Sequence, residues 1–466
     1  MSHFALEIND AGLVLARGGS EADVVGEHPG VALLGAKGIV TGDSAARQSR
    51  MQPLGIQNDF WRTLGTEPLP RTAAGRPLSA ADLAFEQLNQ VIEPFREGLS
   101  GLLLAVPPGY SRTQLGLLLG IASEARIPVI GMVDSSLAAT AYESVAPRVM
   151  HLDLQLHQAV LSVLEADGSG FRRSRFEILP GRGWLALQQA WLHHIAGAFV
   201  RRTRFDPLHQ AATEQVLADR LPGWLAALAE QESVTAEIEF NQAVHTVELK
   251  REDFIATVQP IYDDLMRLIQ STRPAGLSVE LQLGHRLERL PGLGDRLAAL
   301  RDCRVRILRR GAAALGALVH AASIAQPAGA TTLVYRLPVA VPVAELPSTE
   351  GSAVATHPSQ RPSHVLFAGR AWAISGEPLT LGWSVAGGRA LPLPASVPGL
   401  SRRHCSISRR NGRVVVEDHS TYGSFVNEER VNGHAVLSVG DRLRLGSPGV
   451  TLDLIQMVDD DGAPQD

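Results

Sequence analysis

Apolar stretches of strand length alternate with longer segments of helical periodicity through the first 325 residues. The helical pattern is clearest in residues 251–271, where apolar side chains recur at a spacing of about 3.6 residues. The predicted strands are residues 4–8, 12–16, 102–106, 129–133, 151–154, 159–165, 235–239, 245–249 and 279–283. The predicted helices are residues 113–124, 251–271 and 311–325, and helices also dominate residues 183–231. This alternation predicts an α/β domain over residues 1–325.

The pattern changes character after residue 325. Residues 326–363 contain six prolines among small and polar residues, which predicts a partly extended linker. Within it, residues 332–335 are apolar and are interpreted as a surface strand or as plain linker. Short strands separated by turns over residues 364–458 predict an all-β sandwich. The acidic end, residues 459–466, is predicted to be disordered.

Composition and charge narrow the function classes. The net charge of −5 provides no general attraction to nucleic acid or to an anionic membrane. No apolar run reaches the roughly 18 residues that a membrane-spanning helix needs. Cys303 and Cys405 are far apart and have neither metal-site spacing nor a disulfide framework. The sequence therefore predicts a cytoplasmic protein. It predicts no membrane span, no nucleic-acid partner and no metal site.

Two turn sequences near the C-terminus carry a specific pattern. Residues 401–404 read Ser-Arg-Arg-His, and residues 420–427 read Ser-Thr-Tyr-Gly-Ser-Phe-Val-Asn. Together they resemble the forkhead-associated (FHA) domain, a β-sandwich that reads phosphothreonine with the loops at one end. The resemblance implies that Ser401 donates a hydrogen bond to phosphate and that Arg402 donates a charge-assisted one. It also implies that Thr421 contacts the bound peptide.

Other residues of the FHA pattern have structural roles. The resemblance implies that His404 buttresses the loops and that Gly423 permits the turn. Asn427 would order the following loop. Gly382 would be the glycine of the family's Gly-Arg step.

The chain departs from the FHA pattern at two positions. Trp383 follows Gly382 where the family has its main phosphate-binding arginine, and Tyr422 replaces a family asparagine. Loss of one charge-assisted hydrogen bond weakens binding by about 1.5–3 kcal/mol, or roughly ten- to hundredfold. Arg402, Arg403 or Arg389 would compensate in part. Two interpretations stay open: weakened phosphopeptide binding, or a sandwich that binds its partner through the same loops without phosphate.

The first 325 residues resemble the actin/DnaK-like ATPase domain, a two-lobed fold with ribonuclease H-like subdomains. The resemblance rests on the order of several segments rather than on any single motif. The matching segments are residues 42–48 (GDSAARQ), 103–107 (LLAVP), 129–139, 152–154 with 161–165, 281–284 with 290–291, and 313–317 (AALGA).

The residues that would hold the nucleotide are altered. The family places phosphates on two glycine-rich hairpins, because bare backbone N–H groups approach an anion closely. In the first hairpin this chain has Asn9 and Asp10, and in the second it has side chains at residues 155–157. Asp10 beside a triphosphate would cost roughly 1–4 kcal/mol at 4 Å. Trp61 occupies the position of the family's catalytic lysine.

By the resemblance, three carboxylates and one glycine of the family's cleft remain, two of them with a changed side-chain length. Glu7 is a lengthened aspartate, Asp134 a shortened catalytic glutamate, and Asp153 keeps the family's acid, while Gly284 survives from the adenosine loop. One interpretation is that these carboxylates cap neighbouring backbone in a degenerate cleft; the other is a remodelled magnesium–nucleotide site. Because phosphoryl transfer depends on positioned donors and a metal ion, the losses predict a pseudo-ATPase.

Two sites that each lack a key group predict a non-catalytic adaptor or scaffold in a bacterial multiprotein assembly. Its partners would be proteins, including proteins that carry phosphothreonine, and no cofactor is predicted. Two alternatives remain. One is an active DnaK-like chaperone that uses ATP and magnesium and is recruited through its FHA domain. The other is an actin-like protein that forms filaments.

Overall fold

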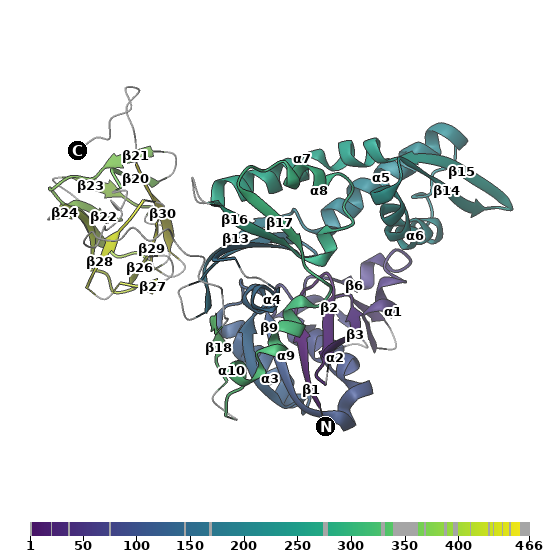
Figure 1. Ribbon diagram of the computed structural model, residues 1–466, viewed down its shortest axis with the longest axis horizontal. Coiled ribbons are helices and arrows are strands. Elements are labelled where there is room, and N and C mark those ends of the chain that lie inside the picture. The colour runs from purple at the N-terminus through teal and green to yellow at the C-terminus, as the bar shows by residue number, and fades with distance from the viewer. Residues whose placement is uncertain are drawn as a thin grey trace, which may run out of the picture. The chain divides into compact units, whose positions relative to one another are not determined.

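A computed structural model gives the arrangement of most of the chain (Figure 1). It describes residues 2–19, 21–35, 38–73, 76–143, 146–166, 170–273, 278–327, 331–338, 362–367, 370–385, 389–394, 399–410, 412–426, 429–431, 433–439, 441–446 and 449–456. The chain divides into two units, Met1–Ala344 and Glu345–Asp466. The predicted disordered tail, residues 459–466, lies outside the described residues.

The first sheet is built from strands that are apolar on both faces. Strands β1 (Ser2–Glu7), β2 (Leu13–Arg17) and β3 (Asp23–His28) form an antiparallel meander. On the other side of β1, strands β9 (Leu99–Val106) and β10 (Val129–Asp134) add in parallel. The last six residues of β9 are all buried, as expected for a parallel strand covered on both faces.

The second sheet repeats this order. Strands β11 (Arg148–Leu154), β12 (Gln158–Ala166) and β13 (Phe171–Pro180) form the antiparallel meander. Strands β16 (Val279–Leu283) and β17 (Cys303–Ile307) then add in parallel beside β11. Each sheet therefore places the turn after its first strand next to the end of a parallel strand.

Two helices pack tightly against each other in the core shared by the two sheets. Helix α4 (Ser135–Glu143) follows β10, and helix α9 (Ala312–Val319) contributes an alanine-rich face. A Cβ atom on Gly316 would lie 2.0 Å from the Ala138 carbonyl oxygen, so glycine is required for this approach. The predicted single helix over residues 311–325 is wrong, because the chain leaves helical geometry at His320 before the short helix α10 (Ala321–Ile324).

Helices cover the outer faces of both sheets. On the first sheet these are α2 (Ala80–Ile92) and α3 (Arg112–Glu124), each begun by a serine capping box. On the second sheet they are α5 (Trp184–Thr203), α6 (Ala211–Glu230) and α7 (Arg251–Thr272). The hairpin of β14 (Ser233–Phe240) and β15 (Ala243–Lys250) packs on α5 and α6.

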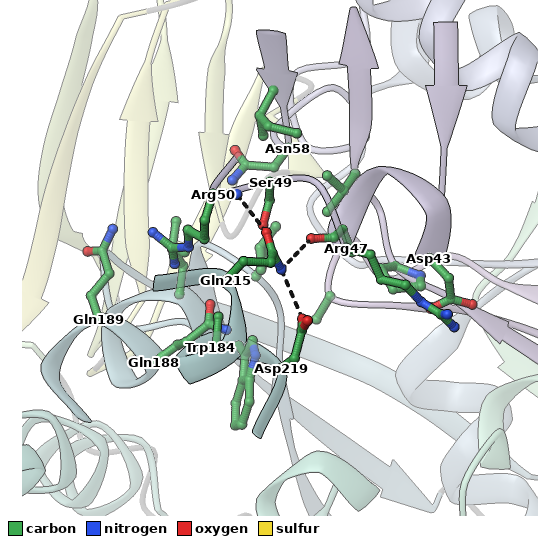
Figure 2. A pocket seen from close by; sticks show the side chains of 18 of the residues that line it. Asp43, Arg47, Ser49, Arg50, Asn58, Trp184, Gln188, Gln189, Gln215 and Asp219 are labelled. Carbon is green, nitrogen blue, oxygen red and sulfur yellow. Dashed lines mark hydrogen bonds between the residues drawn. The ribbon is translucent and has the colours of Figure 1, made fainter. Parts of the chain in front are cut away.

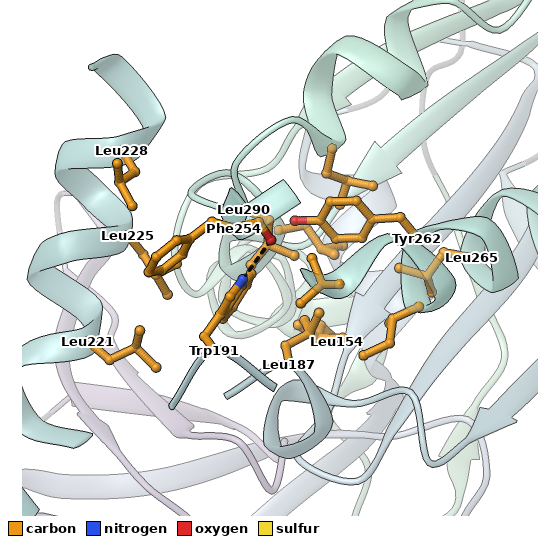
Figure 3. Packing of buried hydrophobic residues seen from close by; sticks show 14 of the residues in the cluster. Leu154, Leu187, Trp191, Leu221, Leu225, Leu228, Phe254, Tyr262, Leu265 and Leu290 are labelled. Carbon is orange, nitrogen blue, oxygen red and sulfur yellow. Dashed lines mark hydrogen bonds between the residues drawn. The ribbon is translucent and has the colours of Figure 1, made fainter. Parts of the chain in front are cut away.

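The core of the second sheet is centred on aromatic side chains (Figure 3). Trp191 is completely buried, and its indole N–H donates to the Phe254 carbonyl oxygen at 3.0 Å. The Trp191 and Phe254 rings stack with their centroids 6.1 Å apart. Burying the indole with its N–H paired avoids the penalty of an unsatisfied donor.

The other elements of this unit are short. They are β4 (Ala32–Gly35), β5 (Gly38–Thr41), α1 (Asp43–Ala46), β6 (Ile56–Gln57), β7 (Pro68–Ala73), β8 (Arg76–Ser79) and α8 (Leu293–Ala298), with 3₁₀ turns at Pro53–Gly55, Glu93–Gly98 and His285–Leu287.

A segment of the predicted linker belongs to both sheets. Strand β18 (Leu333–Val334) pairs with β10, and strand β19 (Arg336–Leu337) pairs with β13. Of the two interpretations of residues 332–335, the surface strand is the one that the structure shows. The linker prediction is wrong for the segment that contains β18 and β19, because apolar side chains such as the fully buried Leu337 pack at the sheet edges. Residues 339–361 of the predicted linker lie outside the described part of the chain.

The second unit is a sandwich of two sheets. One contains β20 (His364–Phe367), β21 (Arg370–Ala373), β26 (Ser424–Val426), β27 (Glu429–Arg430), β29 (Arg442–Leu445) and β30 (Val450–Ile455). The other contains β22 (Leu379–Gly382), β23 (Ala390–Pro392), β24 (Cys405–Arg410), β25 (Arg413–Asp418) and β28 (His434–Leu437). Alternate apolar side chains from both sheets fill the space between them.

Candidate functional site: the cleft and the sandwich loops

The β1–β2 turn and the β11–β12 turn are hydrogen-bonded to each other. The Asn9 side-chain amide donates to the Asp153 carboxylate at 2.9 Å and to the Leu154 carbonyl oxygen at 3.3 Å. Its own carbonyl oxygen accepts from the Ala11 N–H at 2.9 Å, which fixes the turn. The structure thus brings together two residues, Asn9 and Asp153, that are 144 positions apart in the chain.

Asp10 places a buried carboxylate between the two turns. One of its oxygens accepts the Leu156 backbone N–H at 2.6 Å, and the side chain is only 4% exposed. Its other oxygen has no hydrogen-bond partner among the residues described. Burial raises the pKa of this carboxyl above its ordinary value. A carboxyl group of the chain itself therefore accepts the backbone N–H of the second turn.

The side chains of Trp61 and Asp134 both form hydrogen bonds within the α/β unit. Trp61 is buried, and its indole N–H donates to the Gln87 side chain at 2.7 Å. Asp134 accepts from the Leu137 N–H at 3.1 Å at the start of α4 and from the Arg173 guanidinium at 2.7 Å. Asp134 is fully buried, so the ion pair is shielded from water.

The remaining carboxylates line a very small cavity. Glu7, Asp153 and Gly284 border a space of about 20 Å³, whereas one water needs roughly 10–15 Å³. Burial raises the pKa of Glu7, although the positive charge of Arg286 opposes the shift. A Cβ atom on Gly284 would lie 2.9 Å from an Asp153 carboxylate oxygen, so the loop passes as close as glycine permits.

A charge cluster that the sequence did not reveal connects the loop after β16 to the first sheet. Arg286 donates to the Gly12 carbonyl oxygen at 2.6 Å and forms an ion pair with Glu27 at 2.6 Å. The His285 ring lies 3.4 Å from the same carboxylate. Burial opposes ionisation of Glu27, but the His285 and Arg286 contacts outweigh it and lower its pKa to about 2. Because Arg286 and Glu27 are 259 positions apart, no local pattern could have paired them.

Two larger cavities are also bordered by Asp10. One of about 170 Å³ lies between Asp10, Trp61 and Tyr110. Another, of about 750 Å³, lies between the segment around α1 and helices α5 and α6 (Figure 2). At its centre Gln215 accepts from the Arg50 N–H at 2.8 Å and donates to Asp219 at 2.9 Å. No sequence pattern predicted this cavity, since its walls come from several segments that are far apart in the chain.

In the second unit, three loops meet at one end of the sandwich, and they contain residues 383–384, 401–404 and 419–423. The fully buried imidazole of His404 accepts from the Ser401 N–H at 3.1 Å and contacts the Gly423 carbonyl oxygen at 3.1 Å. Burial lowers the pKa of His404, which favours the neutral ring that can accept at one nitrogen and donate at the other. Gly423 has a φ of 84°, in the left-handed region that glycine tolerates.

A family profile described as FHA domain matches residues 388–446. These residues contain an FHA domain. A search of curated proteins found no match. Among the described residues, no helix is long and apolar enough to cross a membrane, and no cluster of His, Cys, Asp or Glu is arranged to hold a metal ion.

The loop end of the FHA domain presents the predicted ligand residues with little internal pairing. The Ser401 hydroxyl oxygen accepts from the Thr421 N–H at 3.2 Å, which leaves its proton free to donate. Arg402 and Arg403 are exposed and form no ion pair with any described residue. The side chains of Trp383 and Tyr422 are 39% and 55% exposed. Asn427 lies outside the described residues.

Proposed function

We propose that the protein is a non-catalytic adaptor of a bacterial, cytoplasmic multiprotein assembly. In this proposal the FHA domain binds a partner that carries phosphothreonine, and the N-terminal α/β unit is an actin/DnaK-like platform that does not turn over ATP. An FHA domain implies a protein-interaction module that binds phosphopeptides. The exposed arginines and hydroxyl groups at its loops are the donors that such a ligand needs.

The repeated topology supports the platform. Each sheet has a three-stranded antiparallel meander followed by two parallel strands, and helices α4 and α9 lie between the sheets. Two such halves with their first turns facing each other would suit an actin/DnaK-like ancestry. The segment containing β18 and β19 adds one strand to each half and thereby ties the platform to the chain that leads to the FHA domain.

The proposal that the platform does not turn over ATP rests on the hydrogen bonds between the β1–β2 turn and the β11–β12 turn. The Asp10 carboxyl group accepts the Leu156 N–H that a phosphate would need, and the Asn9 amide donates to the Asp153 carboxylate. The Arg286–Glu27 pair adds a second connection across the same cleft. Because phosphoryl transfer requires positioned donors and a metal around the phosphates, turns whose polar groups already bond each other argue against it.

Calorimetry on the full chain tests both parts of the proposal. We expect no heat of binding with ATP and magnesium, and binding of a phosphothreonine peptide pool but not of its dephosphorylated copy. Micromolar affinity for ATP would overturn the non-catalytic platform. Equal binding of the two peptide pools would overturn the phosphopeptide-reading function.

A further inference from the structure

A tryptophan and an arginine stack on each other at the loop end of the FHA domain. The guanidinium carbon of Arg402 lies 5.6 Å from the centre of the Trp383 ring. Both side chains are exposed, so burial in the sandwich core does not impose this contact. A cation over an aromatic face at this distance is attracted by the ring quadrupole.

The backbone places these two residues side by side. The Trp383 N–H donates to the Ser401 carbonyl oxygen at 3.4 Å, and the Ser384 N–H donates to the Arg402 carbonyl oxygen at 3.1 Å. A Cβ atom on Gly382 would lie 2.1 Å from the Arg402 carbonyl oxygen, so only glycine allows the two loops to approach this closely.

Arg402 forms no ion pair with any residue of the domain that the structure describes. Two of the described acids beside the loops have other partners: Asp418 accepts from the Ser420 and Ser424 hydroxyl groups, and Glu417 pairs with Arg410. A guanidinium can stack with its face while its N–H groups bind an anion along the edge. Stacking on Trp383 therefore restricts the side chain of Arg402 and leaves its donors available.

We propose that Trp383 is a positioning residue, which holds Arg402 so that its N–H edge meets the phosphate of a bound phosphothreonine. This proposal rests on the proposed function of the FHA domain. The Ser401 hydroxyl, fixed by the Thr421 N–H, supplies a second donor from the same loop. By the resemblance to the FHA pattern, Trp383 stands where the family has an arginine, and in this proposal the indole replaces a direct phosphate contact by ordering the neighbouring cation.

Binding measurements on the full chain test this role. The probe is a fluorescent phosphothreonine peptide pool, compared with its dephosphorylated copy. We expect Trp383→Ala to weaken phosphopeptide binding about 3- to 30-fold, and Trp383→Phe, which keeps an aromatic face, to restore most of it. The double variant Trp383→Ala/Arg402→Ala is expected to bind no more weakly than Arg402→Ala alone, because the tryptophan acts through the arginine.

A second stacked pair in the same domain provides the matched control. Arg370 lies 5.5 Å from the Trp372 ring on β21, which contributes to none of the three loops. Trp372→Ala should leave phosphopeptide affinity unchanged. A purely structural role for Trp383 is tested by NMR: the Arg402 side-chain N–H should carry a ring-current shift that is lost in Trp383→Ala and retained in Trp383→Phe.

The possible failures are distinguishable. If the wild-type chain binds both peptide pools equally, the phosphopeptide function fails, and the positioning role fails with it. If the wild-type chain prefers the phosphorylated pool but Trp383→Ala binds as well, only the positioning role is overturned. Additive losses from Trp383→Ala and Arg402→Ala would likewise overturn it, since they would show that the tryptophan acts independently of the arginine.

Discussion

The cleft of the α/β unit and the loop end of the FHA domain use charged residues in opposite ways. In the cleft, Asp10, Asp134 and Glu27 accept hydrogen bonds from other parts of the same chain and are largely shielded from water. At the FHA loops, Arg402 and Arg403 are exposed and form no ion pair with any residue the structure describes.

The difference separates residues that stabilise the fold from residues available to a ligand. A buried charged group whose partner is removed is left with a desolvation penalty, so its loss destabilises the protein. An exposed cation without a partner contributes little to stability, but it can form charge-assisted bonds with an incoming anion. Substitutions in the cleft should therefore change folding, and substitutions at the loops should change binding.

The largest expected effect is the difference in stability between substitutions at two tryptophans. Trp61→Ala should lower the free energy of unfolding of the first unit by about 3–5 kcal/mol, because it empties a buried site and leaves the Gln87 side-chain oxygen without the indole donor. Trp383→Ala should change the stability of the second unit by no more than about 0.5 kcal/mol, because its side chain is exposed. Hydrogen exchange followed by mass spectrometry reads the two units separately. Equal effects of the two substitutions would remove the contrast between them.

Asp10 gives the next largest effect. Asp10→Ala should destabilise the first unit by about 1–3 kcal/mol, because the Leu156 N–H loses its acceptor. Asp10→Asn keeps an acceptor oxygen and removes a charge that burial disfavours, so its cost should be smaller. The measurement is urea unfolding of both variants, with exchange of the Leu156 amide as a local probe. If the two variants lose equal stability, the carboxylate oxygen is not the group that matters.

Much of the fold could be predicted from the chain because its strands are strongly apolar. The predicted strand over residues 279–283 matches β16, and the predicted helix over residues 251–271 matches α7 to within one residue. Strand β13 was not predicted, because its sequence, FRRSRFEILP, lacks a clear period of two. For residues 332–335 a surface strand and plain linker both stayed open, since two-residue strands give no periodicity and their pairing depends on sheet edges that are distant in the chain.

Only those site residues that belong to a short sequence motif could be predicted from the sequence. The loop residues Ser401, Arg402 and His404 could be named because they fall in one short turn. The stack of Arg402 on Trp383 could not, because it depends on how two loops are hydrogen-bonded. The Arg286–Glu27 pair could not be predicted either, because its two residues are 259 positions apart in the chain and meet only in the folded structure.

The smallest expected effect concerns pH and the buried histidine of the FHA loops. Burial lowers the pKa of His404 below the ordinary value of 6.5, although the Gly423 carbonyl and Asp418 favour the proton. Below about pH 6.5 the unfolded chain therefore binds a proton that the folded ring resists, so the second unit should lose stability as the pH falls from 7.5 to 5.5. The loss cannot exceed about 1.4 kcal/mol per pH unit for one proton.

The matched variant is His404→Gln, in which an uncharged side chain occupies the same position between the loops. It should be less stable than the wild type at pH 7.5, because it cannot reach both Ser401 and Gly423 as the ring does. Its stability should also depend less on pH over the same interval, since the titrating group is gone. Urea unfolding at several pH values, read by hydrogen exchange in β24 and β26, provides the comparison. If the wild type and the variant lose equal stability on acidification, another group controls the pH response, and the neutral ring of His404 is not what holds the loops in place.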